Sequence, residues 1–256
     1  MVLRVDSDAL RNPDDSLECI LRSGAVDHRQ PVSSSSCQRK EANMRNLNVQ
    51  KFELGPIGTN AFLLWEDGGE DAVLVDAPPD AKESIEPILK LRELRLSALW
   101  LTHGHWDHMA GAWELVGDDV EILGHKDDLA LFEDPQRMAS FAMPGMDFQP
   151  VEVTRWVEDG ETFHTFDRET QVAHCPGHCP GNVAFNLPEE RRCFVGDVIF
   201  SGSVGRADLP GGDFTVLENS IRTKIYALPD ETVLHPGHGP DTTVRQEKAT
   251  NPFVRV

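Results

Sequence analysis

Long hydrophobic runs are absent from the sequence, and cysteine is scarce in it. No apolar stretch approaches the roughly 18 residues that a membrane-spanning helix needs. The first ten residues already carry Arg4, Asp6 and Asp8, so we expect no secretory signal peptide. Five cysteines in 256 residues are sparse and odd in number, which is not the pattern of a disulfide scaffold. These absences together favour a cytoplasmic protein.

Basic residues are also in short supply. The chain has 24 Lys and Arg against 43 Asp and Glu, a formal net charge of −19. Such a surface repels nucleic-acid phosphates and anionic membranes, so we expect neither as a partner. An anionic substrate would need a locally positive site, which bound metal ions can supply. A Gly-x-Ser-x-Gly motif is missing too, so the sequence does not indicate a serine hydrolase.

The first 44 residues differ in texture from the rest. They combine mixed charges, four consecutive serines at Ser33–Ser36 and apolar residues without a clean period. We interpret residues 1–44 as a disordered extension, with a packed helix over residues 15–22 as the alternative. Residues 45–256 are then expected to form one domain, a size that a single hydrophobic core can support.

From Val49 onward, short apolar runs alternate with turns, which is typical of β-strands. Ten strands are predicted, at Val49–Leu54, Ala61–Trp65, Ala72–Val75, Ala98–Leu101, Val120–Leu123, Val151–Val157, Gln171–His174, Val183–Leu187, Cys193–Val195 and Thr232–Leu234. Asp67-Gly68-Gly69 predicts a hairpin turn between two of them.

Helical spacing interrupts the strands in three places. It predicts helices over Ala81–Leu94, His108–Val116 and Asp213–Leu228. Pro87 has to sit in the early turns of the first of these or kink it. Strands with interspersed helices indicate a layered α/β architecture.

A dense group of metal-ligating residue types follows the predicted strand Ala98–Leu101. The motif is His-x-His-x-Asp-His, from His103 to His108. Residues two apart in an extended segment point the same way, so His103 and His105 can bind one metal. Asp107 and His108, at the expected start of a helix, face a second position. Four solvated loop residues are the alternative.

Three more candidate ligands lie downstream, each at a predicted strand end. They are His178 in Cys-Pro-Gly-His, Asp197 in Val-Gly-Asp and His238 in His-Pro-Gly-His. Each has Gly or Pro beside it, and loops at strand ends are where sites concentrate. Taken singly, each could be an ordinary turn residue. Together with the first motif they indicate a site.

This order of motifs resembles the metallo-β-lactamase superfamily. Within it, the stretch Phe194–Asp213 and the final Asn251-Pro252-Phe253 look like the single-domain, glyoxalase II-type branch. The resemblance covers about residue 45 to the C-terminus. It implies an α/β fold, the four-layered αββα sandwich, with the site at one edge of the sheets.

The resemblance also implies a two-metal site with seven ligands: His103, His105 and His178 on the first metal, Asp107, His108 and His238 on the second, and Asp197 bridging them. Such an imidazole-rich set suits Zn, and also Fe or Mn. Asp76, at the end of a predicted strand, is expected to support the ligand loops by hydrogen bonds. Two divalent ions with two aspartates and a hydroxide leave the site at about +1, which suits an anionic transition state.

The activity implied is hydrolysis of a small-molecule thioester, S-2-hydroxyacylglutathione, by a metal-bound hydroxide. Asp107 would be both ligand and proton acceptor. Arg206 is a candidate for binding the substrate carboxylate, with a salt bridge to Asp208 or Asp213 as the equal alternative. Larger members of the branch carry a C-terminal helical domain that helps bind glutathione, whereas only 18 residues follow His238 here. A different thiol ester is therefore an alternative substrate.

Two further readings stay open. A persulfide dioxygenase would hold one iron on His103, His178 and Asp197, and a lactonase or β-lactamase would share the two-metal chemistry. Cys179 stands where the family pattern leads us to expect Thr. It is interpreted as a space-filling residue, with a thiolate ligand or a redox pair with Cys175 as the alternatives.

Overall fold

The computed structural model describes residues 45–117, 119–146 and 148–256, all within one compact unit. The extension predicted over residues 1–44, and the alternative helix over residues 15–22, lie outside the described residues. The strands of the described part form two six-stranded sheets and one small hairpin.

The first sheet follows chain order. Its neighbouring strands are β1 (Leu47–Leu54), β2 (Thr59–Glu66), β3 (Asp71–Val75), β4 (Arg95–Trp100), β5 (Glu121–Gly124) and β6 (Arg155–Trp156). β1 to β3 are antiparallel, whereas β3 to β6 run parallel. The predicted turn is confirmed between β2 and β3, where Gly68 has a φ of 69° and the Gly69 N–H donates to the Glu66 carbonyl at 3.0 Å. Since parallel strands end at one edge, the residues after β3, β4 and β5 gather there.

The second sheet crosses over in chain order. Its neighbouring strands are β14 (Thr242–Thr243), β13 (Val233–Pro236), β10 (Arg192–Gly196), β9 (Val183–Leu187), β8 (Arg168–His174) and β7 (Thr162–Thr165). β10 and β13 are parallel, so the residues that follow them also meet at one edge. β11 (Ile199–Phe200) and β12 (Ser203–Val204) form the separate hairpin.

Alternation along the strands explains the layers. In β2, Ala61, Leu63 and Trp65 lie in one hydrophobic cluster together with residues of the helices, while Phe62 and Leu64 lie in another that joins the two sheets. Successive side chains of a strand point to opposite faces, and both faces here are buried. Burial on both faces requires a layer on each side, which is why β2 reads as an unbroken apolar run.

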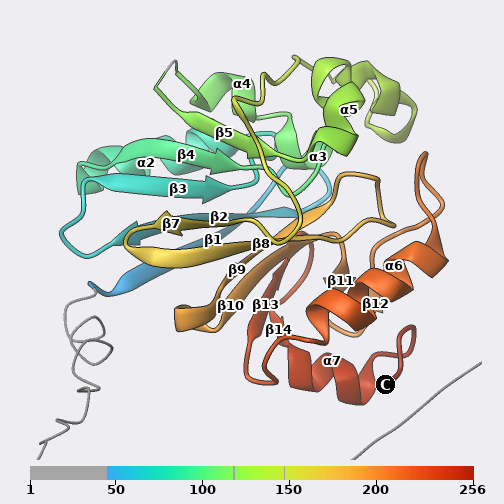
Figure 1. Ribbon diagram of the computed structural model, residues 1–256. Coiled ribbons are helices and arrows are strands. Elements are labelled where there is room, and N and C mark those ends of the chain that lie inside the picture. Colours follow the sequence, from blue (N-terminus) through green and yellow to red (C-terminus); the bar gives the residue numbers. More distant parts are fainter. Residues whose placement is uncertain (1–44, 118, 147) are drawn as a thin grey trace, which may run out of the picture. The chain divides into compact units, whose positions relative to one another are not determined.

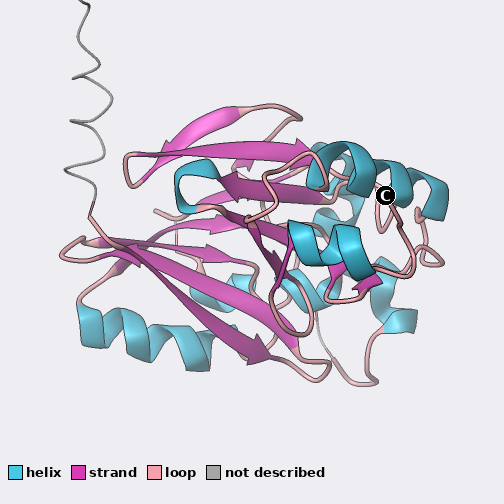
Figure 2. Ribbon diagram, turned by 90° about the horizontal axis from the view of Figure 1, so that it is seen from below, coloured by secondary structure: helices cyan, strands magenta, loops and turns pink. Residues whose placement is uncertain are grey.

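Helices complete the outer layers. On the first sheet lie α2 (Ala81–Arg92), α3 (Trp106–Met109), α4 (Ala112–Leu115) and α5 (Leu129–Glu133), and on the second α6 (Phe214–Ser220) and α7 (Val244–Thr250). In Figure 1 the first group lies at the top and α6 and α7 lie at the bottom, and Figure 2 shows helices in cyan along the outside of the strands. The predicted αββα sandwich is confirmed. None of the helices in the described ranges is long and apolar enough to cross a membrane.

Several element boundaries differ from the sequence prediction. The strand predicted over Val151–Val157 is paired only at Arg155–Trp156, and Val151 and Val153 are instead loop residues buried in the core. The helix predicted over His108–Val116 breaks at Gly111, where a Cβ would lie 2.1 Å from the Pro78 carbonyl oxygen. A short apolar segment by itself does not show whether it forms a strand, a helix or a buried loop.

The third predicted helix begins where expected. The Asp213 side chain accepts hydrogen bonds from the N–H groups of Thr215 at 2.7 Å and Val216 at 3.2 Å, and so caps α6. After Ser220 the chain continues as a π-helical turn, Ile221–Ile225. In the first predicted helix, Pro87 lies in the second turn of α2 on its exposed side, and the helix continues past it.

Candidate metal centre

The seven predicted ligands are brought to one edge by the two sheets. His103 and His105 follow β4, and Asp107 and His108 lie on α3 directly after them. The other three come from the second sheet: His178 follows β8, Asp197 follows β10 and His238 follows β13. All but His238, whose side chain is 26% exposed, are buried. Each sheet therefore supplies only part of the ligand set.

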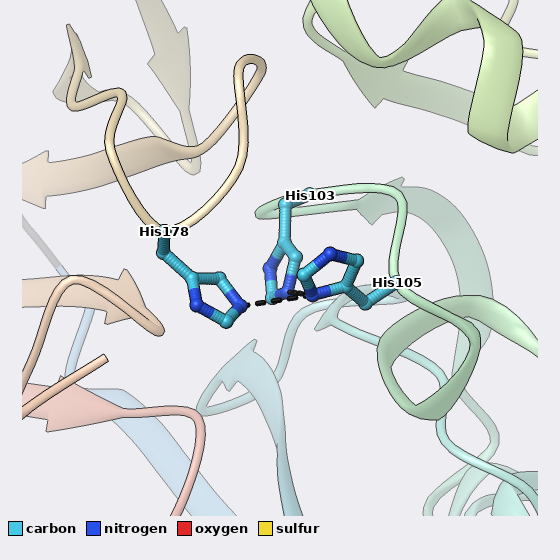
Figure 3. A group of neighbouring side chains, drawn as sticks. All are labelled: His103, His105 and His178. Atoms are coloured by element: carbon cyan, nitrogen blue, oxygen red, sulfur yellow. Dashed lines mark hydrogen bonds between the residues drawn. The ribbon is translucent and has the colours of Figure 1, made fainter. Parts of the chain in front are cut away.

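The first cluster consists of His103, His105 and His178. His103 Nε2 lies 3.1 Å from His105 Nδ1, and His178 Nε2 lies 2.9 Å from that same nitrogen. Figure 3 shows the three rings converging from two loops, with His178 opposite the other two. Three convergent imidazole nitrogens cannot all be satisfied by sharing protons among themselves, and they form a ligand set that suits a transition metal.

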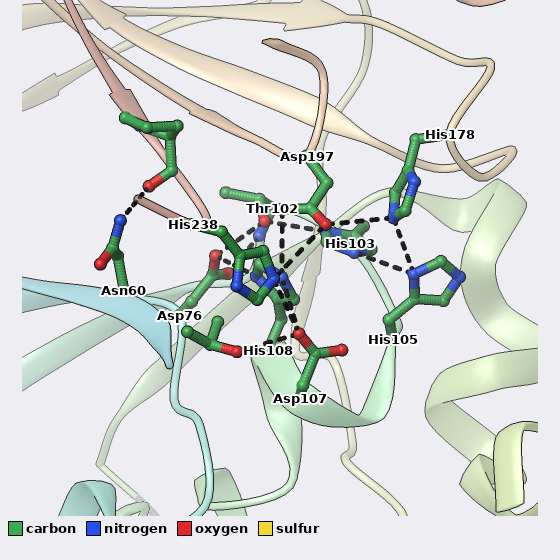
Figure 4. Close-up of polar contacts among 12 residues, drawn as sticks. Asn60, Asp76, Thr102, His103, His105, Asp107, His108, His178, Asp197 and His238 are labelled. Carbon is green, nitrogen blue, oxygen red and sulfur yellow. Dashed lines mark hydrogen bonds and ion pairs between the residues drawn. The ribbon is translucent and has the colours of Figure 1, made fainter. Parts of the chain in front are cut away.

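The second cluster consists of Asp107, His108 and His238. Asp107 Oδ2 lies 3.3 Å from His108 Nε2 and 3.2 Å from His238 Nε2. Figure 4 shows these side chains beside the first cluster. One carboxylate and two imidazoles can hold a second divalent ion.

Asp197 lies between the two clusters. Its Oδ2 is 3.5 Å from His178 Nε2 of the first cluster and 3.6 Å from His238 Nε2 of the second. Its Oδ1 is 3.3 Å from His108 Nε2, yet both atoms are buried and neither has a hydrogen-bond partner among the described residues. Buried polar atoms are seldom left without partners. These two atoms fit a site in which a cation sits between them.

The charge states of the clusters differ. Burial, reinforced by neighbouring imidazoles, lowers the pKa of His105 to about 3 and that of His103 well below its usual value. Burial also opposes the charge of His108, but Asp107, Asp197 and Asp76 outweigh it and raise the pKa of His108 well above its usual value. Without a metal, His103 and His105 are therefore neutral, whereas His108 carries a proton.

The two aspartates are charged at neutral pH. Burial alone would raise their pKa values, but His108 and His238 lower the pKa of Asp107 well below its usual range. His108 and His178 likewise lower the pKa of Asp197 to about 2. Both carboxylates are thus available to a cation without first losing a proton.

Asp76 supports His108 as expected for a residue that orients a ligand. Its Oδ2 accepts from His108 Nδ1 at 2.8 Å and from the Thr102 hydroxyl at 2.8 Å, and its Oδ1 accepts from the Thr102 N–H at 2.8 Å. The bond to Nδ1 turns His108 Nε2 toward the second cluster. Asp76 has a left-handed φ of 57°, a conformation that Asp tolerates better than most residues.

Two further contacts orient ligands, and one of them has no sequence motif. His178 Nδ1 donates to the Arg206 carbonyl at 2.7 Å, which leaves Nε2 for the first cluster. Thr59, at the start of β2, donates its hydroxyl to Asp107 Oδ2 at 3.0 Å. Sequence reasoning missed Thr59, because only the pairing of Thr59 with His238 across the sheets brings it to the site.

Arg206 lies at the surface rather than within the clusters. Its guanidinium makes two hydrogen bonds of 2.9 Å to the carboxylate of Asp208, and its side chain is 63% exposed. This is the salt bridge that the sequence offered as the alternative to substrate binding. A surface pair of this kind contributes little to stability, so the guanidinium can exchange Asp208 for another carboxylate.

A third group of potential ligands, His125, Asp127 and His174, lies apart from the two clusters. The two rings stack with centroids 3.9 Å apart. His125 Nδ1 accepts from the Asp127 N–H at 3.3 Å, and His174 Nε2 lies 2.7 Å from the Pro180 carbonyl oxygen. Because those nitrogens already have main-chain partners, we assign no metal to this group.

Comparison with known proteins agrees with this geometry. The hydroxyacylglutathione hydrolase GloC of Haemophilus influenzae is 38% identical over 213 residues, covering 81% of this chain and 98% of GloC. The B3 metallo-β-lactamase BLEG-1 superposes with a TM-score of 0.75 at 34% identity, covering 81% of this chain and 99% of BLEG-1. TTHA1623, solved in a di-iron-bound form, gives 0.69 at 40% identity, covering 80% and 100%.

The fold and the centre together are those of a metal-dependent hydrolase. The chain belongs to the metallo-β-lactamase superfamily, whose family model matches residues 54–238. That range begins at the end of β1 and ends at His238, so it includes every residue of both clusters.

Proposed function

We propose that the protein is a binuclear thioesterase that hydrolyses S-2-hydroxyacylglutathione. The observation that carries the proposal is the complete second cluster: Asp107, His108 and His238 converge beside the first cluster, with Asp197 between them. The similarity to GloC supports the choice of substrate. Three free, buried cysteines among the described residues suit a reducing compartment, so a cytoplasmic location is part of the proposal.

The bound metals would supply a hydroxide at neutral pH and an electrophile for the thioester carbonyl. Asp107 is ionised at neutral pH and would accept the proton released during hydrolysis. The Thr59 hydroxyl holds Asp107 Oδ2 in place, and Asp76 and the Arg206 carbonyl keep His108 and His178 in the ligating orientation. Substrate would approach past His238, the most exposed ligand side chain.

We propose zinc as the resident metal, because imidazole and carboxylate ligands suit it. The di-iron form of TTHA1623 makes iron the main competitor. The Arg206 guanidinium would release Asp208 and bind a carboxylate of the substrate. This contact would be the most exposed one in the proposed site.

The test combines metal analysis and turnover on one sample. Purified protein is assayed for metal content by mass spectrometry and for S-lactoylglutathione hydrolysis. About two metals per chain with turnover would support the binuclear thioesterase. One iron per chain, no hydrolysis, and oxygen uptake with glutathione persulfide would replace it with the dioxygenase.

A further inference from the structure

Asp128 is a buried carboxylate that the proposed reaction does not use. It ends the short helix Lys126–Asp128 and is 1% exposed. Its Oδ2 accepts from the Gly104 N–H at 2.8 Å and from the Cys179 thiol at 3.2 Å, and its Oδ1 accepts from the Gly181 N–H at 2.6 Å. A buried charge is retained only where such partners compensate its lost hydration.

The three donors belong to the two loops that build the first cluster. Gly104 separates His103 from His105 on the first sheet's side. Cys179 directly follows His178 on the second sheet's side, and Gly181 lies two residues further. Asp128 therefore connects the two halves of a cluster whose ligands come from different sheets.

Close packing leaves this connection little freedom. A Cβ on Gly181 would lie 2.6 Å from Asp128 Cγ. A Cβ on Gly104 would lie 3.3 Å from Asp128 Cβ and 2.8 Å from the Cβ of Leu131. Glycine is therefore required at position 181 by Asp128 itself, and at position 104 mainly by Leu131, with Asp128 in tight contact. A shift of Asp128 would move both loops.

We propose that Asp128 is the positioning residue of the first cluster: its carboxylate sets the spacing between the His103–His105 loop and the His178 loop, with Cys179 as a hydrogen-bond donor in that contact. The proposal rests on the proposed function only in requiring that the first cluster bind a metal. The hydrogen bonds of Asp128 go to the two loops and not to the candidate ligand side chains themselves.

This assignment explains Cys179, where the family pattern leads us to expect Thr. A threonine hydroxyl offers the same donor to Asp128 Oδ2. The Cys179 side chain is fully buried and its Sγ lies 3.2 Å from Asp128 Oδ2, so its proton is held in that hydrogen bond. A protonated thiol is neither a metal ligand nor a redox nucleophile.

Asp128→Asn is the direct test. The amide presents an NH₂ group to donors that need an acceptor, so the two loops should separate. We expect the affinity for the first metal to fall about 10- to 100-fold, the range for lost partners of metal ligands, while the second metal changes less than about threefold. Competition with a chromophoric chelator measures both affinities. The visible spectrum of the cobalt-substituted protein reports the first cluster's geometry without any turnover.

Glu247→Gln is the matched control. Glu247 is also fully buried and also accepts several hydrogen bonds, from Gly202, Thr242 and Asn251, away from the first cluster. The Glu247→Gln substitution should lower thermal stability and leave the affinity for the first metal unchanged. An equal loss of that metal in Glu247→Gln would overturn the proposal, because burial of an acid alone would then explain the effect.

Two substitutions at Cys179 keep the proposal testable if Asp128→Asn does not fold. Cys179→Thr keeps a donor and should bind the first metal as the wild type does. Cys179→Val has nearly the shape of the Thr variant but lacks the donor, and should bind the first metal about fivefold more weakly than Cys179→Thr. Equal affinities in these two variants, or wild-type affinity in folded Asp128→Asn, would refute the role of Asp128. If Asp128→Asn loses the first metal but the wild type does not hydrolyse the thioester, the positioning role of Asp128 stands and the proposed substrate is rejected.

Discussion

The two clusters of the metal centre lie side by side but present different chemistry to a cation. The first offers three buried imidazoles, and burial lowers the pKa of His103 well below its usual value and that of His105 to about 3. The second offers a carboxylate and two histidines, of which His108 has a raised pKa and His238 is partly exposed. We therefore expect little competition from protons for His103 and His105 at the first position. We expect the second position to release a proton when it binds its metal, and its ligand His238 is the one nearest to solvent.

The largest effects should come from single substitutions that each remove one candidate ligand, His103 in the first cluster or His238 in the second. His103→Ala should lose the first metal, and turnover should fall about 1000-fold because the electrophile and the hydroxide are both impaired. His238→Ala should retain the first metal while losing the second. Metal analysis and hydrolysis rates on both variants make the comparison, and full turnover in His103→Ala would show that the site is wrongly assigned. Asp197→Ala should lose both metals.

Removing a residue that supports a ligand should weaken metal binding at one cluster only, and by less than removing the ligand does. Asp76→Ala deletes the acceptor of His108 Nδ1, so the second metal should bind about 10- to 100-fold more weakly. Chelator competition checks this against Asp71→Ala, a control at the other end of β3 whose carboxylate makes only a surface ion pair with Arg95. If both variants bind the second metal alike, Asp76 does not orient His108.

Acidity should distinguish the clusters as well. His108 has a raised pKa, so at neutral pH it is protonated in the metal-free fold and the second metal must displace that proton. Affinity for the second metal should therefore rise about tenfold per pH unit below the pKa of His108, and more steeply where His238 is also protonated, because, against its burial, Asp107 and Asp197 raise the pKa of His238. His103 has a pKa well below its usual value and His105 a pKa of about 3, so these two ligands should add almost no pH dependence to the first affinity from about pH 5 to 8. Isothermal titrations in buffers of different ionisation enthalpy count the protons released. Equal proton release at both positions would contradict the contrast.

The smallest effect belongs to the surface. Arg206→Ala should raise KM about fivefold, since an exposed charged hydrogen bond is partly screened, and should leave kcat and both metals unchanged. Asp208→Ala frees the guanidinium from its partner and should lower KM instead. An unchanged KM in both variants would show that Arg206 does not bind the substrate and only forms the salt bridge with Asp208.

The seven clustered side chains were predictable because each carries a local signal. Four of them fall within the six residues from His103 to His108, and the other three follow apolar strands beside Gly or Pro. Their supporting residues carry no such signal. Thr59 reaches the centre through a contact with a residue 48 positions away, and Asp128 through contacts with residues 24, 51 and 53 positions away. Local pattern does not contain that information.

The fold shows the same division. The alternating or unbroken apolar runs of the central strands predicted β2, β3 and β9 well, because both faces of these strands are buried. The segment Val151–Val157 looked equally apolar, but its valines fill the core from a loop. The strands β7 and β14 and the helix α7 escaped prediction, since they are short and at least partly exposed.

The division of the ligands between the sheets has a consequence for how the chain acquires its metals. The segment His103–His108 carries four of the seven candidate ligands within six residues and can offer them before the chain folds, whereas His178, Asp197 and His238 follow strands of the second sheet and join them only in the folded protein. A metal captured early by that segment also stabilises the unfolded state and so reduces the stabilisation gained on folding. We therefore expect the chain to refold more slowly in excess zinc than without metal. The centre would be completed when the second sheet packs against the first.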